Sequence, residues 1–365
     1  MTGWPMWTVG EPRLLAGLDQ VQRIGLDEHR RLHGHLPTHC REAWEDLAAA
    51  TALLGRGGAG FPVVRKLAAI PAGGAYAVVV NGSESEPLSV KDRTLMRRTP
   101  HLVVDGALGL AGALRARVVT VAVHDPESAS SMRAAVRERR DARRVRVVVQ
   151  PEHFVAGEAR AVIRHASGGP ALPPGRRTLP SDDGLHGRPT FLSNAETFAQ
   201  LAVLAKSGPR VYAERGVAEE PGTSLLTVTG AVRRPGVVEV PNGVPLSIIL
   251  EAAGGEGESA VLMGGYHGAW VPPGSRIVLS RPALQRSGLS FGAGVVAVVG
   301  PDSCPLGEVE LVAQPSGYSG MRRSSPGEVH APTRTGSPGS SRRLWIALAP
   351  TSWTTHGTAP AAVRS

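Results

Sequence analysis

The sequence predicts an α/β protein with a mostly parallel sheet, followed by a smaller β-rich domain. Between residues 75 and 169, runs of β-branched apolar residues alternate with longer segments of helical periodicity, which is typical of parallel strands joined by crossover helices. After residue 223, short strands and one helix recur at close spacing, which is typical of a small β-grasp domain. With 365 residues, 42% of them hydrophobic and 19% charged, the chain can build two apolar cores.

The N-terminal residues 1–40 are predicted to form a helical lead-in. Residues 11–35 have weak helical periodicity, with apolar side chains on one side at Leu14, Leu15, Leu18, Val21 and Ile24. A cluster that includes His29, His33, His35, His39 and Cys40 suggests metal binding. Because Pro37 breaks the helix and no carboxylate completes a ligand set, an exposed polar segment is the simpler interpretation.

The stretch GRGGAGFP at residues 55–62 contains the spacing G-x-G-x-x-G. A Rossmann fingerprint must follow a strand, whereas residues 41–54 are rich in alanine and leucine and predict a helix. Pro62 suits the first turn of a second helix, so the loop joins two helices and the Rossmann interpretation fails. Its glycines still allow backbone N–H groups to converge on an anion, so we expect a phosphate site of another topology.

The parallel sheet is predicted from apolar runs at residues 75–82, 116–124 and 145–150. Helical segments are predicted at residues 101–114, 126–140 and 157–169. A loop rich in proline, glycine and arginine follows at 168–189, and we interpret it as a functional flap before a helix that starts at Asn194. Residues 41–210 are therefore expected to form the first domain.

The second domain is expected at residues 223–306, with a hairpin, a helix from residue 245 and strands near 260–271 and 292–300. It carries no acid/base pair or nucleophile set, so we expect packing or partner contact to be its role. Residues 307–365 are dense in serine, glycine, proline and arginine without hydrophobic periodicity. This composition predicts a disordered tail.

Charge and targeting signals point to an ordinary cytoplasmic protein. The formal net charge is +9, but the densest basic run, residues 137–147, is interrupted by Glu138 and Asp141 and leads into a strand. A solvated helix face is the simpler interpretation, so we expect no nucleic-acid partner, although a basic tail that binds nucleic acid stays open. Two cysteines give no disulfide framework. The chain shows neither a signal peptide nor a run long enough for membrane insertion.

Four stretches in order resemble one protein family. They are GRGGAGFPVVRK, NGSESEPLSVKDR, GRPTFLSNAETFAQL and VTGAVRRPGVVEVPNGVPLSIIL, within residues 53–306. They are similar to the NADH-binding 51 kDa flavoprotein subunit of respiratory complex I and its stand-alone relatives. The resemblance implies a Rossmann-like FMN and NADH domain followed by an SLBB-type β-grasp domain. It implies hydride transfer from NADH to flavin, then electron transfer to a partner such as a ferredoxin-like protein, in the cytoplasm or at the periphery of a membrane complex.

The resemblance also implies which residues bind the cofactor and the substrate. NADH contacts are implied at Phe61, which would stack on adenine, at Lys66, and at Glu86, which would reach a ribose hydroxyl. No catalytic protein side chain is implied, because hydride transfer takes place on the flavin. FMN contacts are implied at Gly55, Arg56, Gly57, Gly58, Ala59, Gly60, Asn81, Glu84, Gly157, Glu158, Asn194 and Thr197.

Taken singly, several of these residues have a purely structural interpretation. Asn81 is suited to capping a turn, Glu84 and Glu86 to the start of a helix, and Lys91 with Asp92 to a surface ion pair. The chain also departs from the family pattern. The motif N-A-D-E reads N-G-S-E at residues 81–84, and G-E-E-x-A reads G-E-A-R-A at 157–161. Aromatic residues expected at two further positions are replaced by Ala69 and Gly175.

A larger departure concerns the end of the resemblance. Relatives continue into a helical region whose cysteines hold a [4Fe-4S] cluster, which needs four thiolates. Since this chain has only Cys40 and Cys304, we expect no such cluster in it and infer a truncation or a reading-frame shift after Leu306. The alternative to an enzyme is therefore a non-catalytic flavin-binding or nucleotide-binding scaffold.

Overall fold

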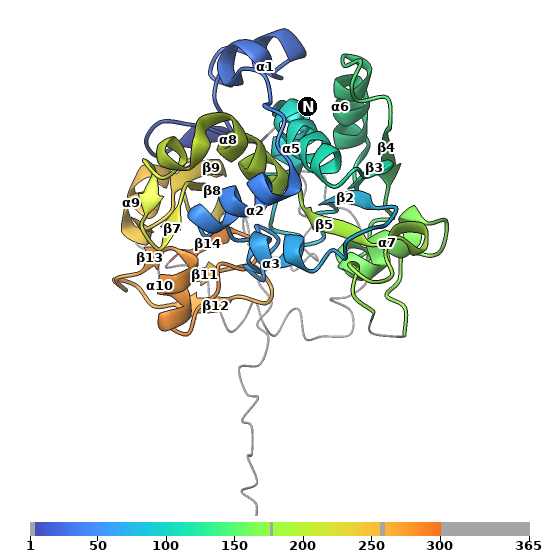
Figure 1. The fold of residues 1–365 in the computed structure, drawn as a ribbon. Helices are drawn as coiled ribbons and strands as arrows, with labels where there is room; N and C mark the ends of the chain where they lie inside the picture. Colours follow the sequence, from blue (N-terminus) through green and yellow to red (C-terminus); the bar gives the residue numbers. More distant parts are fainter. Residues whose placement is uncertain (1–3, 176–177, 256–259, 301–365) are drawn as a thin grey trace, which may run out of the picture.

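The computed structural model describes residues 4–175, 178–255 and 260–300. Figure 1 shows two domains side by side, with the parallel sheet on the right and the smaller domain on the left. One contains a four-stranded parallel sheet, and the other a six-stranded mixed sheet. The predicted α/β class with a parallel sheet and a β-grasp-like second unit is thereby confirmed. The predicted tail at residues 307–365 lies outside the described residues.

The parallel sheet has the strand order β4-β3-β2-β5. Its strands are β2 (Ala77–Gly82), β3 (Val118–Val123), β4 (Val145–Val149) and β5 (Thr190–Asn194), and every neighbouring pair is parallel. The chain proceeds outward from β2 through β3 to β4, then returns to place β5 on the other side of β2. The strand order thus reverses between β2 and β5, and ligands of open α/β sheets bind beyond the carboxyl ends of the strands at such a point.

Helices cover both faces of this sheet. Helices α5 (Pro100–Ala113), α6 (Pro126–Arg137) and α8 (Ala195–Tyr212) pack on the face that carries Val78 and Val80. Helix α7 (Ala159–Ala166) packs on the opposite face, against Ala77 and Val79. Because both faces are buried, the strands are nearly continuous in apolar residues rather than alternating.

Three short helices lie near the ends of the parallel strands. Helices α2 (Arg41–Ala50) and α3 (Val63–Ala68) flank the glycine loop, as predicted. Helix α4 (Lys91–Arg98) follows the loop after β2 and was not predicted, and neither was β5. Both additions matter because their ends border the site described below.

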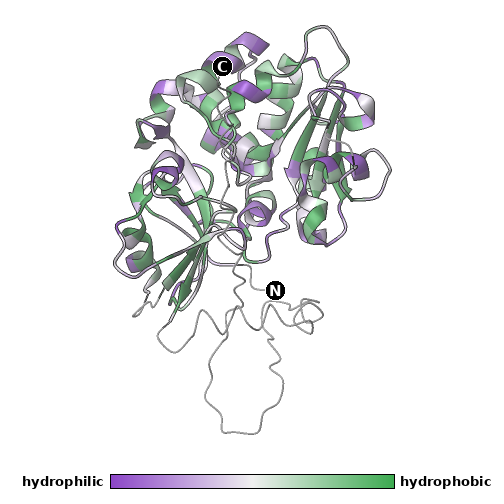
Figure 2. Cartoon of the chain, turned by 90° about the horizontal axis from the view of Figure 1, so that it is seen from below, coloured by the Kyte–Doolittle hydropathy of each residue, from purple (hydrophilic) through white to green (hydrophobic). Residues whose placement is uncertain are grey.

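The second domain is built on the sheet order β1-β9-β8-β14-β11-β12. A core of apolar side chains lies between this sheet and helix α9 (Leu246–Ala253). Figure 2 shows that the strands of both sheets are predominantly hydrophobic. The remaining elements of this domain are β8 (Thr223–Gly230), β9 (Gly236–Pro241), β11 (Ala260–Met263), β12 (Ala269–Val271), β14 (Val295–Val299), helix α10 (Arg281–Arg286) and the short pairs β6 (Gly216–Val217) with β7 (Glu220–Pro221) and β10 (Val244–Pro245) with β13 (Val278–Leu279).

The helical lead-in predicted at residues 11–35 is wrong for its first part. Only α1 (Leu26–His33) is helical, while β1 (Met6–Thr8) joins the second domain by pairing in parallel with β9. The buried carboxylate of Glu239 accepts hydrogen bonds from three successive amides, including Leu14 N at 2.9 Å and Leu15 N at 3.0 Å. These bonds satisfy the backbone in an irregular turn, so the apolar side chains are buried without a helix.

Helix α1 contacts the first domain through a buried histidine. His29 Nε2 lies 2.7 Å from Asp105 Oδ2 on α5, and Lys206 and Arg139 also pair with Asp105. The interpretation of an exposed polar segment is therefore wrong for His29. Among the described residues, no group of three or more His, Cys, Asp or Glu side chains is arranged to hold a metal ion.

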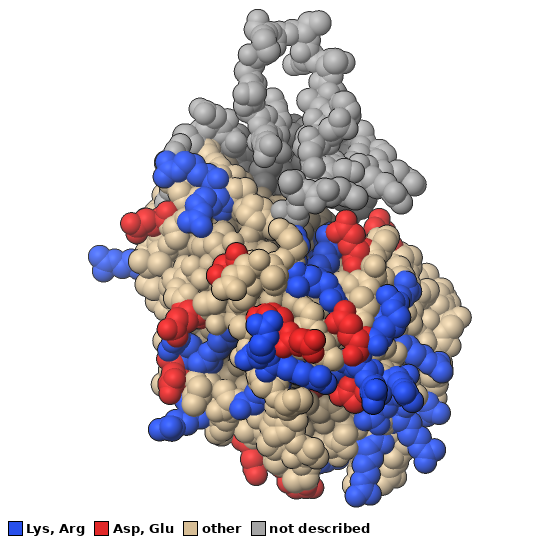
Figure 3. All heavy atoms as spheres, turned by 90° about the horizontal axis from the view of Figure 1, so that it is seen from above, with Lys and Arg blue, Asp and Glu red and all other residues tan. Residues whose placement is uncertain are grey.

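The basic run at residues 137–147 is a connection rather than a helix face. Helix α6 ends at Arg137 and β4 begins at Val145, while the two acids between them pair with His101 and Arg139. Figure 3 shows Lys and Arg side chains gathering toward the right of this view, the side on which α6 and β4 lie in Figure 1. Among the helices that the structure describes, none is long and apolar enough to cross a membrane.

Candidate functional site

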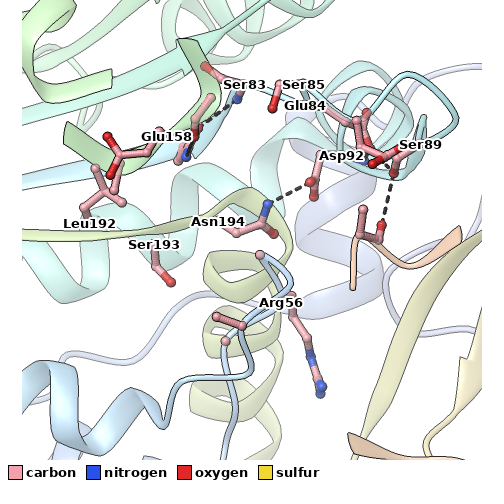
Figure 4. A pocket seen from close by; sticks show the side chains of 18 of the residues that line it. Arg56, Ser83, Glu84, Ser85, Ser89, Asp92, Glu158, Leu192, Ser193 and Asn194 are labelled. Atoms are coloured by element: carbon pink, nitrogen blue, oxygen red, sulfur yellow. Dashed lines mark hydrogen bonds between the residues drawn. The ribbon is translucent and has the colours of Figure 1, made fainter. Parts of the chain in front are cut away.

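A pocket of about 340 Å³ lies beyond the carboxyl ends of β2 and β5, where the strand order reverses. Its walls come from the glycine loop, the loop after β2, the start of α7, the end of β5 and Ala293 of the second domain (Figure 4). Among the residues assigned from the resemblance, only Gly58 and Thr197 do not line it. Those that line it are Gly55, Arg56, Gly57, Ala59, Gly60, Phe61, Lys66, Asn81, Glu84, Glu86, Gly157, Glu158 and Asn194.

The glycine loop is closed by its own backbone. Gly55 N donates to Phe61 O at 3.0 Å, and Gly58 and Gly60 have φ of +103° and +61°, which favour glycine. Within the described part of the chain, the amides of Gly57, Gly58, Ala59 and Gly60 have no hydrogen-bond acceptor. Three of these four residues line the pocket, so the loop offers free N–H donors there.

The side chain of Arg56 points away from the pocket and anchors the loop (Figure 4). The residue is 1% exposed, and its Nη1 lies 2.6 Å from Glu220 Oε1 of the second domain. The amide of Arg56 donates to Thr197 Oγ1 at 2.9 Å. Arg56 and Thr197 were assigned to FMN, but these side chains hold the loop in place from behind.

Glu84 is engaged at the start of α4. Its carboxylate accepts hydrogen bonds from Ser89 Oγ at 2.6 Å and from the amides of Asp92 and Arg93, each at 3.1 Å. A carboxylate in this place satisfies free amides and complements the helix dipole. The contacts of Glu84 agree with its interpretation as an acid at the start of a helix. The residue also lines the pocket.

Lys91 and Asp92 are buried, so the interpretation of a surface ion pair is wrong. Lys91 Nζ lies 2.7 Å from Glu196 Oε2 and 3.2 Å from Asp92 Oδ1. Burial alone would lower the pKa of Lys91, but the carboxylates of Asp92, Glu196 and Glu84 raise it above its usual range. Burial raises the pKa of Asp92 to about 6, against the opposing effect of Lys91. The ammonium group therefore stays charged beneath the pocket.

Two asparagines and a glycine join the loops around the pocket. Asn81 Nδ2 donates to Gly157 O at 2.9 Å, and its Oδ1 accepts from Ser83 N at 3.0 Å. A Cβ on Gly157 would lie only 2.9 Å from Ser83 O, so the close approach requires glycine. Asn194 caps α8 by accepting from Glu196 N at 2.9 Å.

Three helices begin at the rim of the pocket, namely α4, α7 and α8. Glu158 caps α7 by accepting hydrogen bonds from Arg160 N and Ala161 N. Residues at the N-terminal end of each helix line the pocket, namely Lys91 and Ala159 in the first turns of α4 and α7 and the cap residue Asn194 of α8. The carboxylates of Glu84 and Glu158 already complement the dipoles of α4 and α7, so the dipole of α8 and the free amides of the glycine loop are what favour an anionic ligand.

Three buried polar atoms at the pocket have no hydrogen-bond partner within the described residues. They are the hydroxyl oxygens of Ser83 and Ser193 and Oε1 of Glu86. Buried polar atoms in native proteins are nearly always satisfied, so a polar ligand is the natural partner for these three. Sequence reasoning missed Ser193, whose position at the carboxyl end of an unpredicted strand was its only signal.

Lys66 and Phe61 complete the open side of the pocket. Lys66 Nζ donates to Leu192 O at 3.2 Å, and it pairs with no carboxylate among the described residues. Burial lowers the pKa of Lys66. Phe61 is 47% exposed. An unpaired cation and an exposed aromatic ring are suited to a ligand that is both charged and planar.

Two family models match this chain. The family described as "Nuo51 FMN-binding domain" matches residues 49–203, and "SLBB domain" matches residues 225–265. The fold and the pocket thus define a flavoprotein-type α/β domain followed by an SLBB domain. Residues 49–203 and 225–265 thus match, in order, the two domains that the sequence motifs indicated, those of the 51 kDa flavoprotein subunit family of respiratory complex I.

Curated relatives and solved structures agree with this assignment. The chain is 27% identical over 299 residues to the F 2 subunit of NADH-quinone oxidoreductase from Rhizobium meliloti, covering 76% of this chain and 71% of the relative. It is 30% identical over 284 residues to the F subunit of NADH-quinone oxidoreductase from Escherichia coli, covering 70% and 62%. A crystal structure of NAD⁺-reducing [NiFe]-hydrogenase in the air-oxidized state matches with a TM-score of 0.74 and 25% identity, covering 88% of this chain and 57% of that one. The chain therefore spans only part of each relative.

Proposed function

We propose that this chain is an FMN-binding oxidoreductase module that accepts hydride from NADH. The observation that carries the proposal is the set of unsatisfied donors and acceptors in one pocket: the free amides of Gly57, Ala59 and Gly60 and the unpartnered hydroxyl oxygens of Ser83 and Ser193. An anionic group can accept hydrogen bonds from the amides, and a ring with polar atoms along its edge can form hydrogen bonds with the side-chain oxygens. The residues present therefore fit FMN. When bound, a flavin supplies the hydride-accepting chemistry, while the protein supplies binding and orientation.

The chain's residues divide into contact and support roles in this proposal. The glycine-loop amides, with the dipole of α8, hold the phosphate. Ser83, Ser193 and the loop beside Gly157 surround the ring, and Arg56 and Thr197 act by fixing the glycine loop. For the dinucleotide, Phe61 offers a stacking face, Lys66 a positive charge and Glu86 a hydrogen-bond acceptor.

We further propose that electrons leave the module to a protein partner. The relatives named above are a subunit of an NADH-quinone oxidoreductase and an NAD⁺-reducing hydrogenase, which supports a partner in general. A ferredoxin-like protein is one class of acceptor that fits this role.

A second candidate is a flavin-binding scaffold that does not oxidise NADH. It is favoured by Ser83 and Ala159, which stand where the family pattern has two acids. Under this alternative the pocket retains FMN, but no dinucleotide reduces it.

Flavin-free protein titrated with FMN and with riboflavin tests the proposal. Because the glycine loop offers charge-assisted hydrogen bonds to a phosphate, we expect FMN to bind at least about tenfold more tightly than riboflavin. Anaerobic NADH should then bleach the flavin absorbance. Equal affinity for the two flavins would contradict the phosphate role of the loop, and bound FMN that NADH does not reduce would favour the scaffold.

A further inference from the structure

The second domain reaches the pocket through the turn between β11 and β12, residues 264–268. Tyr266 N in this turn donates to Glu86 Oε2 at 3.0 Å. Gly265 lies directly against the same carboxyl group, since a Cβ built on it would be 2.6 Å from Glu86 Cδ and Oε2. One oxygen of Glu86 is thus fixed by the second domain.

The other oxygen of Glu86 is available for a ligand. Glu86 Oε1 is buried and has no hydrogen-bond partner among the described residues, and Glu86 lines the pocket. Burial raises the pKa of Glu86, while the nearby amides of Tyr266 and Leu88 oppose this shift by stabilising the charged carboxyl group. One carboxyl oxygen of Glu86 therefore accepts a hydrogen bond from the turn, and the other has no hydrogen-bond donor and lies beside the pocket. Buried acceptors are nearly always hydrogen-bonded, so we expect a ligand to supply a donor such as a hydroxyl group to this oxygen.

The turn is fixed by its own contacts, so it can act as a rigid support. Gly264 N donates to Val295 O at 2.8 Å, and Ala293 N donates to Gly264 O at 2.8 Å. His267 stacks on Phe154 with ring centroids 5.6 Å apart and an interplanar angle of 24°. Phe154 belongs to the short helix Phe154–Gly157, which ends at the pocket wall. The turn therefore contacts two separate segments of the first domain that border the pocket.

We propose that Gly265 and Tyr266 are positioning residues that hold Glu86 so that its free oxygen accepts a ribose hydroxyl of the dinucleotide. The turn at residues 264–268 then sets the affinity for NAD(H) through Glu86. This inference rests on the proposed function, because it concerns the dinucleotide side of the same pocket. Pre-organisation explains the effect, since a carboxylate already held in place loses little freedom when the ligand binds.

The substitution Gly265→Ala tests this inference. The added Cβ overlaps the end of the Glu86 side chain, a flexible group that moves more readily than backbone, so the carboxyl group is displaced while the fold persists. Loss of one hydrogen bond to a charged group should raise the dissociation constant for NAD⁺, measured by calorimetry, by about tenfold or more. We expect the FMN affinity to stay within about twofold of the unsubstituted protein.

Gly274→Ala is the matched control. Gly265 and Gly274 have φ of +91° and +71°, so alanine is strained at both positions, but a Cβ on Gly274 meets nothing within 4 Å. We expect Gly274→Ala to leave NAD⁺ affinity unchanged. In a Glu86→Ala background, Gly265→Ala should weaken NAD⁺ binding no further, because the group that it displaces is gone.

The outcomes separate this inference from the proposed function. An equal loss in Gly265→Ala and Gly274→Ala, or unchanged NAD⁺ affinity in Gly265→Ala, would overturn the positioning role while FMN binding and NADH oxidation stand. A further loss from Gly265→Ala in the Glu86→Ala background would also overturn it. An unsubstituted protein that binds FMN but neither NAD⁺ nor NADH would overturn both this inference and the proposed NADH oxidation.

Discussion

Replacing Arg56 by methionine removes the buried guanidinium that ties the glycine loop to the second domain. Arg56 Nη1 lies 2.6 Å from Glu220 Oε1, and Nη2 lies 3.2 Å from Thr223 O. Removing one partner of a buried ion pair costs about 3–5 kcal/mol of unfolding free energy. Here the carboxylate of Glu220 keeps a second cation, Arg281, so we expect about 3 kcal/mol.

The electrostatics around Arg281 support the lower figure. Burial, with the nearby charge of Arg56, lowers the pKa of Arg281 to about 10. Removing Arg56 relieves this repulsion, so part of the lost attraction to Glu220 is recovered. The variant Arg56→Met should therefore fold, with a glycine loop held mainly by the Thr197 hydroxyl.

Urea denaturation of Arg56→Met, Glu220→Gln and the double variant gives the free energies of unfolding. Because the two side chains are in direct contact, the double variant should lose about 1–3 kcal/mol less than the sum of the single losses. FMN affinity should fall in each single variant, since the loop amides lose their fixed positions. A loss in Arg56→Met below about 1 kcal/mol, which is typical of surface pairs, together with unchanged FMN affinity would refute the anchoring role.

Two further predictions concern single side chains. Ser193→Ala should weaken FMN binding about three- to tenfold, because one hydrogen bond is lost, while the free energy of unfolding changes by less than about 1 kcal/mol. Fluorescence titration and urea denaturation measure the two effects, and unchanged FMN affinity would contradict the contact. Burial lowers the pKa of His101 to about 4, although its bond to Glu138 opposes the shift. In the unfolded state the pKa of histidine is about 6.5, so the unfolded state binds the proton more readily than the folded state. The free energy of unfolding therefore falls by up to about 3 kcal/mol as the pH is lowered from above 6.5 toward 4. Unfolding free energies at several pH values should show a smaller loss in His101→Gln, and an equal loss would contradict this explanation.

Local sequence patterns were sufficient to predict most strands of the parallel sheet. Residues 77–80 and 118–123 are buried on both faces, so their apolar runs stand out between helical periods. Strand β5 escaped prediction because its five residues run straight into α8, and Asn194 both ends the strand and caps the helix. Strand β1 pairs with β9, which is distant in sequence, so no local pattern reveals it.

The position of the site followed from sequence better than the role of each residue did. Motifs after β2 and β5 meet because the carboxyl ends of parallel strands share one edge. The direction of each side chain was not predictable, because Arg56 turns toward Glu220 of the other domain and Glu84 toward the start of an unpredicted helix. Gly82 stands where the family pattern has alanine, and Met96 of that helix fills the space that a Cβ would need.

The most direct test of the account is an anaerobic titration of the FMN-loaded protein with NADH, followed by its visible absorbance. We expect the flavin band to bleach in proportion to the NADH added, and dithionite to bleach no more of it. A chain that takes up no FMN, or whose bound FMN responds to dithionite and not to NADH, would contradict the proposed oxidoreductase function.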